Sequence, residues 1–173
     1  MYKYSYSSLM EIAMSAVQHD ETVQRYAQEH CGAQVAVFSE MPTEDPPVEG
    51  DCPLVAFSPV GGSLGQGEDE FIRELAFRLA IQVDPALDAQ DTVDTESGRV
   101  LRRDYFGTAT LTNLLELIYD ALAGAFNRRD IQLTSVGETI ESAGLGLYQA
   151  RGELGFHLPS CIGERRPDED EQY

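Results

Sequence analysis

The residues best suited to chemistry form a short run at the end of a predicted helix, where Glu29, His30 and Cys31 follow one another. Carboxylate, imidazole and thiolate groups all bind zinc, but a zinc site needs about four ligands, usually in short paired spacings. The other histidines and cysteines are isolated along the chain: His19, Cys52, His157 and Cys161. We therefore expect no metal ion and no cofactor, and a capping or surface role for His30. A composite zinc site assembled by the fold is the alternative.

The sequence also lacks the arrangement of residues that nucleophilic catalysis requires. Catalytic serine and cysteine residues depend on a positioned histidine, yet His19 and His30 fall on one predicted helix and His157 alternates with apolar residues on the last predicted strand. The one match to the G-x-S-x-G motif, residues 61–65, leads into a predicted strand, whereas the nucleophile turn of this motif leads into a helix. With 30 acidic residues, chance carboxylate pairs are unavoidable, so their number does not argue for a glycosidase. We expect no catalytic residues and no enzymatic activity.

The glycine-rich run G-G-S-L-G-Q-G, residues 61–67, has the outline of a phosphate-binding loop without its chemistry. Such a loop needs a lysine after its last glycine to meet the phosphates, and a following helix that offers its amide groups. Here three acidic residues, 68–70, follow Gly67 and repel phosphate, and the next predicted element is a strand. The run therefore predicts a flexible hairpin loop.

A second long connection, residues 84–104, contains six acidic residues and three arginines. Its acids match a calcium-binding loop only loosely, because Val93 occupies the second ligand position if Asp91 is the first. At about 20 residues, the segment is longer than an ordinary connection. We expect a solvated loop. A weak cation site and an ordered contact with a neighbouring subunit are the alternatives.

The charge of the chain narrows the classes of partner. Of its 173 residues, 30 are acidic and 12 are basic, for a net charge of −18. Such a surface repels phosphates, which argues against sequence-specific nucleic-acid binding and against binding to anionic membranes. No apolar run approaches the roughly 18 residues of a membrane span, and Glu11 interrupts the only stretch comparable with a signal peptide. Three widely spaced cysteines favour a reducing compartment, so we expect a soluble, intracellular protein.

The hydrophobic pattern predicts one domain over residues 1–163 and an acidic, disordered tail over 164–173. Residues 70–84 alternate apolar and polar side chains, which is typical of a long, half-buried strand. Two helices are predicted, over residues 7–29 and 112–126. Ser7 or Ser8 would cap the first helix and Gly32 would end it, and Thr112 would cap the second. Extended segments are predicted over 33–39, 53–60, 131–140 and 145–158. The prolines of 53–60 suggest an edge strand or a short element. This order indicates an α+β fold, with a mainly antiparallel sheet and two helices packed on one face.

In the order of its predicted elements, the chain resembles the tail terminator, or tail completion, proteins of long-tailed bacteriophages. In that family an N-terminal helix precedes a strand entered through a proline, and a glycine- and acid-rich turn leads to a long strand. A second helix and a closing strand follow. The matching segments, within residues 5–160, are D-C-P-L-V-A-F (51–57), R-E-L-A-F-R-L-A-I-Q-V (73–83), T-N-L-L-E-L-I-Y-D-A-L (112–122) and Y-Q-A-R-G-E-L-G-F-H-L (148–158).

The resemblance implies a structural virion protein of the tail, assembled in the host cytoplasm. It implies a homo-oligomeric ring, typically a hexamer, that caps the tail tube and joins it to the head, with tail tube and head-tail connector proteins as partners. DNA would pass through an acidic lumen without specific binding, because the lumen offers phosphates no basic partner. The alternative is a small acidic binding or adaptor module, such as another head-tail connector protein, that offers a sheet edge to its partner.

Two groups of residues are predicted to form subunit interfaces. Four glycines would let the tip of a hairpin conform to a neighbour: Gly61, Gly62, Gly65 and Gly67. Three arginines form the only basic cluster beside an acidic loop: Arg99, Arg102 and Arg103. They are expected to pair with acids of the next subunit, such as Glu40, Glu44 or Asp45. Pairing with acids of their own chain is the alternative.

Overall fold

A five-stranded sheet forms the centre of the fold, and its strands follow the alternation in the sequence. The computed structural model describes residues 4–39, 52–64, 70–87, 89–144 and 146–159. The strands are β1 (Ala36–Ser39), β2 (Leu54–Leu64), β3 (Glu70–Gln82), β6 (Gln132–Gly144) and β7 (Leu147–Pro159). Their order in the sheet is β1-β2-β3-β7-β6, with β1 parallel to β2 and the other neighbours antiparallel. The long strand predicted over 70–84 is confirmed as β3, at the centre of the sheet.

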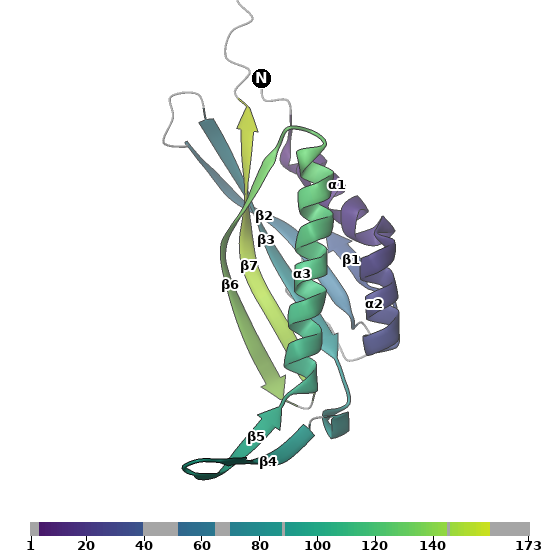
Figure 1. Cartoon of the computed structure of the whole chain (residues 1–173). Coiled ribbons are helices and arrows are strands. Elements are labelled where there is room, and N and C mark those ends of the chain that lie inside the picture. Colours follow the sequence, from purple (N-terminus) through teal and green to yellow (C-terminus); the bar gives the residue numbers. More distant parts are fainter. Residues whose placement is uncertain (1–3, 40–51, 65–69, 88, 145, 160–173) are drawn as a thin grey trace, which may run out of the picture.

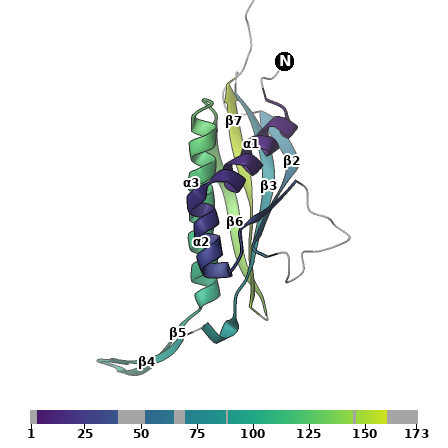
Figure 2. The same ribbon diagram turned by 90° about the vertical axis from the view of Figure 1, so that its right-hand side faces the viewer.

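Three helices cover one face of this sheet (Figures 1 and 2): α1 (Tyr6–His19), α2 (Glu21–Cys31) and α3 (Phe106–Asn127). The expected α+β fold is confirmed, with three described helices in place of the two predicted. The predicted helix over 7–29 is divided at Asp20, whose backbone is extended (φ −78°, ψ 111°). The Asp20 carboxylate accepts hydrogen bonds from the amides of Thr22 and Val23, so it caps the start of α2. Gly32 ends α2 in the left-handed conformation (φ 81°), as predicted.

Both predicted helix starts lie too far along the chain. The cap of α1 is Ser5, whose Oγ accepts a hydrogen bond from the Ser8 amide at 3.1 Å. α3 begins at Phe106, and Thr112 lies inside it. The first turns of α3 contain a glycine and two threonines, which have low helix propensity and hide the helix from sequence reasoning. Gly107 is buried against the ring of Tyr148 on β7, and a Cβ at this position would overlap that ring, so the close packing of α3 on β7 requires a glycine here.

The β2 strand is not the short element expected, because it runs for 11 residues. Only residues 54–57 lie between β1 and β3, so the expected edge position is wrong for this part and holds at Pro59, where β3 is the one described neighbour. Its inner proline, Pro59, sits at a β-bulge, where the register with β3 shifts between Pro59 and Gly61, so the missing amide is tolerated. Because β2 continues to Leu64, Gly61 and Gly62 lie within the strand rather than at a hairpin tip. Gly65 and Gly67 lie outside the described residues, as do the segments 40–51 and 164–173.

The prediction of a solvated loop over 84–104 is wrong for most of these residues. A short 3₁₀ turn, η2 (Pro85–Leu87), leads into a hairpin of β4 (Ala89–Thr95) and β5 (Gly98–Asp104). The turn places Thr95 opposite Gly98, and Gly98 has a φ of 126°, a conformation that favours glycine. The hairpin extends from one end of the sheet, away from the body of the protein (Figure 1). We call this hairpin, residues 89–104, the arm.

At the far edge of the sheet, β6 confirms the extended segment predicted over 131–140 but pairs irregularly with β7. Its register shifts twice, between Ser135 and Gly137 and again between Ser142 and Gly144. By contrast, β3 and β7 pair without any shift from Glu70 to Gln82. The sheet therefore has a regular centre and an interrupted edge.

The hydrophobic core lies between the sheet and the three helices. Phe126 of α3 packs against Phe156 of β7, with ring centroids 4.6 Å apart. Phe77 of β3 meets Tyr119 of α3 edge to face at 5.7 Å, and its ring also lies against Gly152, its register partner on β7. Other fully buried side chains of this core are Leu9, Val17, Phe57, Leu79, Leu114, Ile118 and Leu122.

The contact at Gly152 gives a test of this packing. A methyl group at Gly152 would overlap the carbonyl oxygen of Gly137 on β6 and the ring of Phe77. We expect Gly152→Ala to lower the free energy of unfolding by about 1–3 kcal/mol, measured by urea denaturation. Gly124→Ala is the matched control, because nothing lies within 4 Å of the added carbon on α3. This control should raise stability by about 0.5–1 kcal/mol, and equal effects of the two changes would contradict the packing.

Candidate functional site

The arm is the first candidate interaction surface, because it exposes apolar side chains without packing on the body. Val93 and Val100 are directly opposite each other and therefore share one face of the arm, with exposed fractions of 40% and 52%. Leu101 lies on the other face and is 54% exposed. An isolated two-stranded hairpin is marginally stable in water unless a third strand or a helix packs on it. Within the described residues no third strand or helix packs on the arm, so its apolar side chains form a candidate contact surface.

The predicted basic cluster lies on this arm. Arg99 Nε donates to Asp94 Oδ1 at 2.9 Å, which is the alternative pairing within the chain. Both side chains are more than three-quarters exposed (79% and 77%), so this ion pair contributes only about 0–1 kcal/mol. In the strand register, Arg102 stands opposite Asp91, and Arg103 is placed opposite Gln90. A role of these arginines at a subunit interface stays a prediction.

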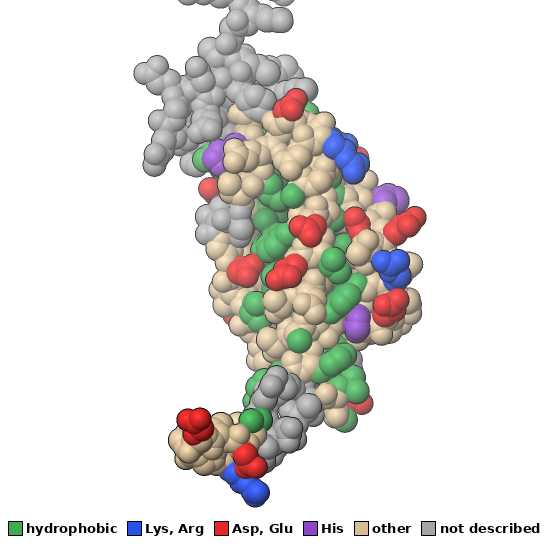
Figure 3. All heavy atoms as spheres, in the orientation of Figure 1, with side chains coloured by type: hydrophobic (Ala, Val, Ile, Leu, Met, Phe, Trp, Pro, Cys, Tyr) green, Lys and Arg blue, Asp and Glu red, His purple; other side chains and the backbone are tan. Residues whose placement is uncertain are grey.

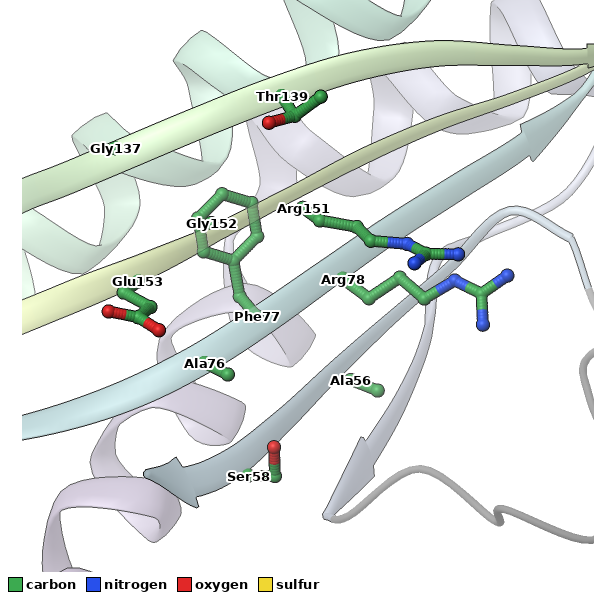
Figure 4. A pocket seen from close by; sticks show the side chains of 10 residues that line it. All are labelled: Ala56, Ser58, Ala76, Phe77, Arg78, Gly137, Thr139, Arg151, Gly152 and Glu153. Atoms are coloured by element: carbon green, nitrogen blue, oxygen red, sulfur yellow. The ribbon is translucent and has the colours of Figure 1, made fainter. Parts of the chain in front are cut away.

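A second candidate surface is a hollow of about 530 Å³ on the face of the sheet that the described helices leave uncovered. Its floor consists mainly of short side chains, among them Ala56, Ser58, Ala76 and Thr139 from three strands. Small residues leave space above a pleated sheet, and here two long side chains, Arg78 and Arg151, border that space (Figure 4). We call this site the arginine hollow.

The two arginines are held in an unfavourable arrangement. Arg78 of β3 and Arg151 of β7 are direct cross-strand neighbours, and like charges in such positions destabilise a sheet. Both donate from Nη2 to the same neutral oxygen, Gln149 Oε1, at 2.6 Å and 3.3 Å. Arg78 Nε is buried without a hydrogen-bond partner. Among the side chains that the structure describes, no carboxylate lies within ion-pair distance of either guanidinium group.

Electrostatics at the arginine hollow follow from this geometry. Burial and then the positive charge of Arg151 lower the pKa of Arg78, while Cys52 and Glu141 act in the opposite direction. The guanidinium group nevertheless stays charged at neutral pH. Glu153 also borders the hollow, but Figure 4 places its carboxylate at the opposite end from the two guanidinium groups. A charged pair that weakens the fold is a candidate for binding an anionic group.

Sequence reasoning missed Arg78 and Arg151. Each is a basic residue in the middle of a strongly alternating strand of an acidic chain, and this signal marks both as facing away from the core. Nothing local indicates that they meet, because 71 residues separate Arg78 from its hydrogen-bond partner Gln149. Their contact depends on the register of β3 and β7.

Of the residues considered for metal binding and catalysis, Cys31 and Cys52 come near each other, and the histidines stay apart from one another. His19 ends α1, and the helix break at Asp20 puts His30 on α2, which corrects the expectation of one helix. His19 Nδ1 lies 3.0 Å from the carbonyl oxygen of Ser15, and His30 stacks on Tyr26 with centroids 4.2 Å apart. In the part of the chain that the structure describes, no three His, Cys, Asp or Glu side chains come together as a metal site would require. The helical face instead carries acidic side chains interspersed with apolar ones (Figure 3).

The arginine pair leads to a prediction about stability. Arg151→Gln removes the like-charge repulsion and leaves the bond from Arg78 to Gln149 in place. We expect the free energy of unfolding to stay unchanged or to rise by up to about 1 kcal/mol, measured by urea denaturation. Arg128→Gln, at an exposed position after α3, is the control and should have no effect. A loss of stability specific to Arg151→Gln would show that the pair supports the fold.

Cys31 leads to a second prediction. Burial raises the pKa of the Cys31 thiol to about 11, and the nearby Cys52 adds to the shift. Because the thiolate is the reactive form, alkylation by iodoacetamide at pH 7.5 should be much slower at Cys31 than in free cysteine. The rate should keep rising with pH until about pH 11 when it is followed by peptide mass spectrometry. A plateau below pH 9 would contradict the shift.

None of the described helices is long and apolar enough to cross a membrane.

Comparisons with known proteins do not assign a family. A scan against protein-family models finds no match for the chain, and a search of curated proteins finds no similar sequence.

Proposed function

We propose that this chain is a structural subunit that assembles into a homo-oligomeric ring, and that the ring caps a bacteriophage tail tube and joins it to the head. The observation that carries the proposal is the arm, which exposes Val93 and Val100 on one face and Leu101 on the other. The phage assignment itself rests on the sequence resemblance to tail terminator proteins. The arm supports the more general part, which is assembly through contacts between chains.

The energetics of the arm favour a partner. Fully burying an apolar side chain of this size contributes about 1.5–3 kcal/mol, and about half of that is left to gain at each of three half-exposed side chains on a hairpin that is marginal alone. The arm projects from one end of the molecule in one direction (Figures 1 and 2). A protrusion that inserts into a different surface of the next copy makes a head-to-tail contact. Such contacts produce a ring when the rotation between copies closes.

The net charge of −18 is compatible with the same role. A ring through which DNA passes must not bind the phosphate backbone tightly, and acidic side chains offer phosphates no partner. The same charge also keeps a small protein soluble before assembly.

A small binding or adaptor module, such as another head-tail connector protein, is the second candidate. It is favoured by β6, which forms an edge of the sheet and exposes residues 137–142. An open edge can pair with a strand of a partner. This function predicts a one-to-one complex with another protein rather than a ring of identical chains.

The arm can be tested without disturbing the core. We expect Val93→Ser combined with Val100→Ser to abolish ring formation and to leave the melting temperature of the monomer unchanged, because both side chains are exposed. Light scattering and negative-stain images, with and without purified tail tubes, measure assembly. Val60→Ser, at a valine of β2 that is 50% exposed, is the matched control and should still assemble. A wild-type chain that neither self-associates nor binds tail tubes would overturn the proposed function.

A further inference from the structure

We propose that the arginine hollow of one copy receives the arm of the next copy, with the Glu96 carboxylate bound between Arg78 and Arg151. This inference rests on the proposed function, because it names the contact through which subunits of the ring join. It commits to a second copy of this chain as the occupant.

On the receiving side, no carboxylate of the described residues lies within ion-pair distance of Arg78 or Arg151. The two guanidinium groups together offer ten N–H donors, and the Gln149 oxygen accepts only one bond from each of them. Arg78 Nε is buried with no hydrogen-bond partner. A carboxylate accepts two parallel bonds from a guanidinium group and carries the charge that would offset the repulsion between the arginines. The site is thus better matched to an acidic side chain than to its own neutral amide.

The arm supplies a suitable carboxylate at its tip. Glu96 lies in the turn between β4 and β5 and is exposed, whereas Asp94 is already paired with Arg99. Each strand of the arm has seven residues, so at about 3.3 Å per residue the tip reaches roughly 20 Å from the body. Val93 and Val100 follow just behind the tip and share one face, where they could cover the small apolar residues of the hollow, Ala56 and Ala76.

The contact must be made between copies. Figure 2 shows the arm extending toward the side of the sheet that carries the helices. The arginine hollow opens on the opposite face of the same sheet. The arm of a chain is therefore directed away from its own hollow. Since the arm and the hollow are different surfaces, the contact is head-to-tail, as a closed ring requires.

A charge swap tests the pairing. One protein carries Glu96→Arg, and a second carries Arg78→Glu with Arg151→Glu. Each alone should self-associate about 30-fold more weakly than wild type in sedimentation experiments, because every contact then joins like charges. An equimolar mixture should regain assembly, because both possible contacts between the two proteins then join opposite charges. Glu116→Arg and Arg128→Glu, at exposed positions on or after α3, are the matched controls and should assemble like wild type.

The outcomes separate this inference from the proposed function. If the wild-type protein forms rings and the swapped variants assemble equally well, the pairing is wrong and the ring function stands. If each variant fails and the mixture also fails, Glu96 is not the partner of the arginines. Arg78→Gln with Arg151→Gln, which avoids placing acids in the sheet, should show the same weakening with an unchanged melting temperature; normal assembly of this variant would likewise overturn the pairing. A wild-type protein that never assembles would overturn both.

Discussion

The structure depends on the pairing of β3 with β7, the two strands at the centre of the sheet. Their register runs without interruption over the whole length of β3. Because side chains alternate across a strand, a slip of one residue would turn Leu75 and Leu79 away from the helices and bring Arg78 into the core. The register is therefore fixed, because apolar side chains must stay on the face of the sheet that packs against the helices. The same register places Arg78 directly opposite Arg151 on the other face.

The two faces of the sheet consequently have different roles. The helical face is closed by α1, α2 and α3, and its side chains satisfy one another through apolar packing. The other face contains charged side chains whose hydrogen-bonding capacity is only partly used within the described residues, at Arg78 above all. The arm adds a third surface, whose apolar residues the described part of the chain leaves exposed. A single copy thus has a closed hydrophobic core and two surfaces, the arm and the arginine hollow, that the proposed assembly would use.

Strong local periodicity made the central elements predictable: β3, β7 and the middle of α3 follow directly from the sequence. The helix break at Asp20 was missed because the apolar stripe continues past it, whereas the break depends on two hydrogen bonds that the Asp20 carboxylate accepts from backbone amides. The arm was missed because its alternation is carried by charged residues, and a solvated loop has the same composition. Its one local signal was the opposite charge of Asp94 and Arg99 on either side of a turn. The arginine hollow depends on contacts between distant strands, which periodicity alone does not pair.

The two register shifts of β6 make open-ended strand pairing between copies of the chain less favourable. A long, regular strand at the edge of a sheet invites the same strand of another molecule, and this kind of pairing has no natural end. At β6 the bulges interrupt the row of amides and carbonyls, and Glu138 and Glu141 add charges that repel an identical strand. Growth along the sheet edge is thereby discouraged at high protein concentration. An assembly of the proposed kind would then form through contacts of other surfaces, which can produce a closed ring with a fixed number of copies.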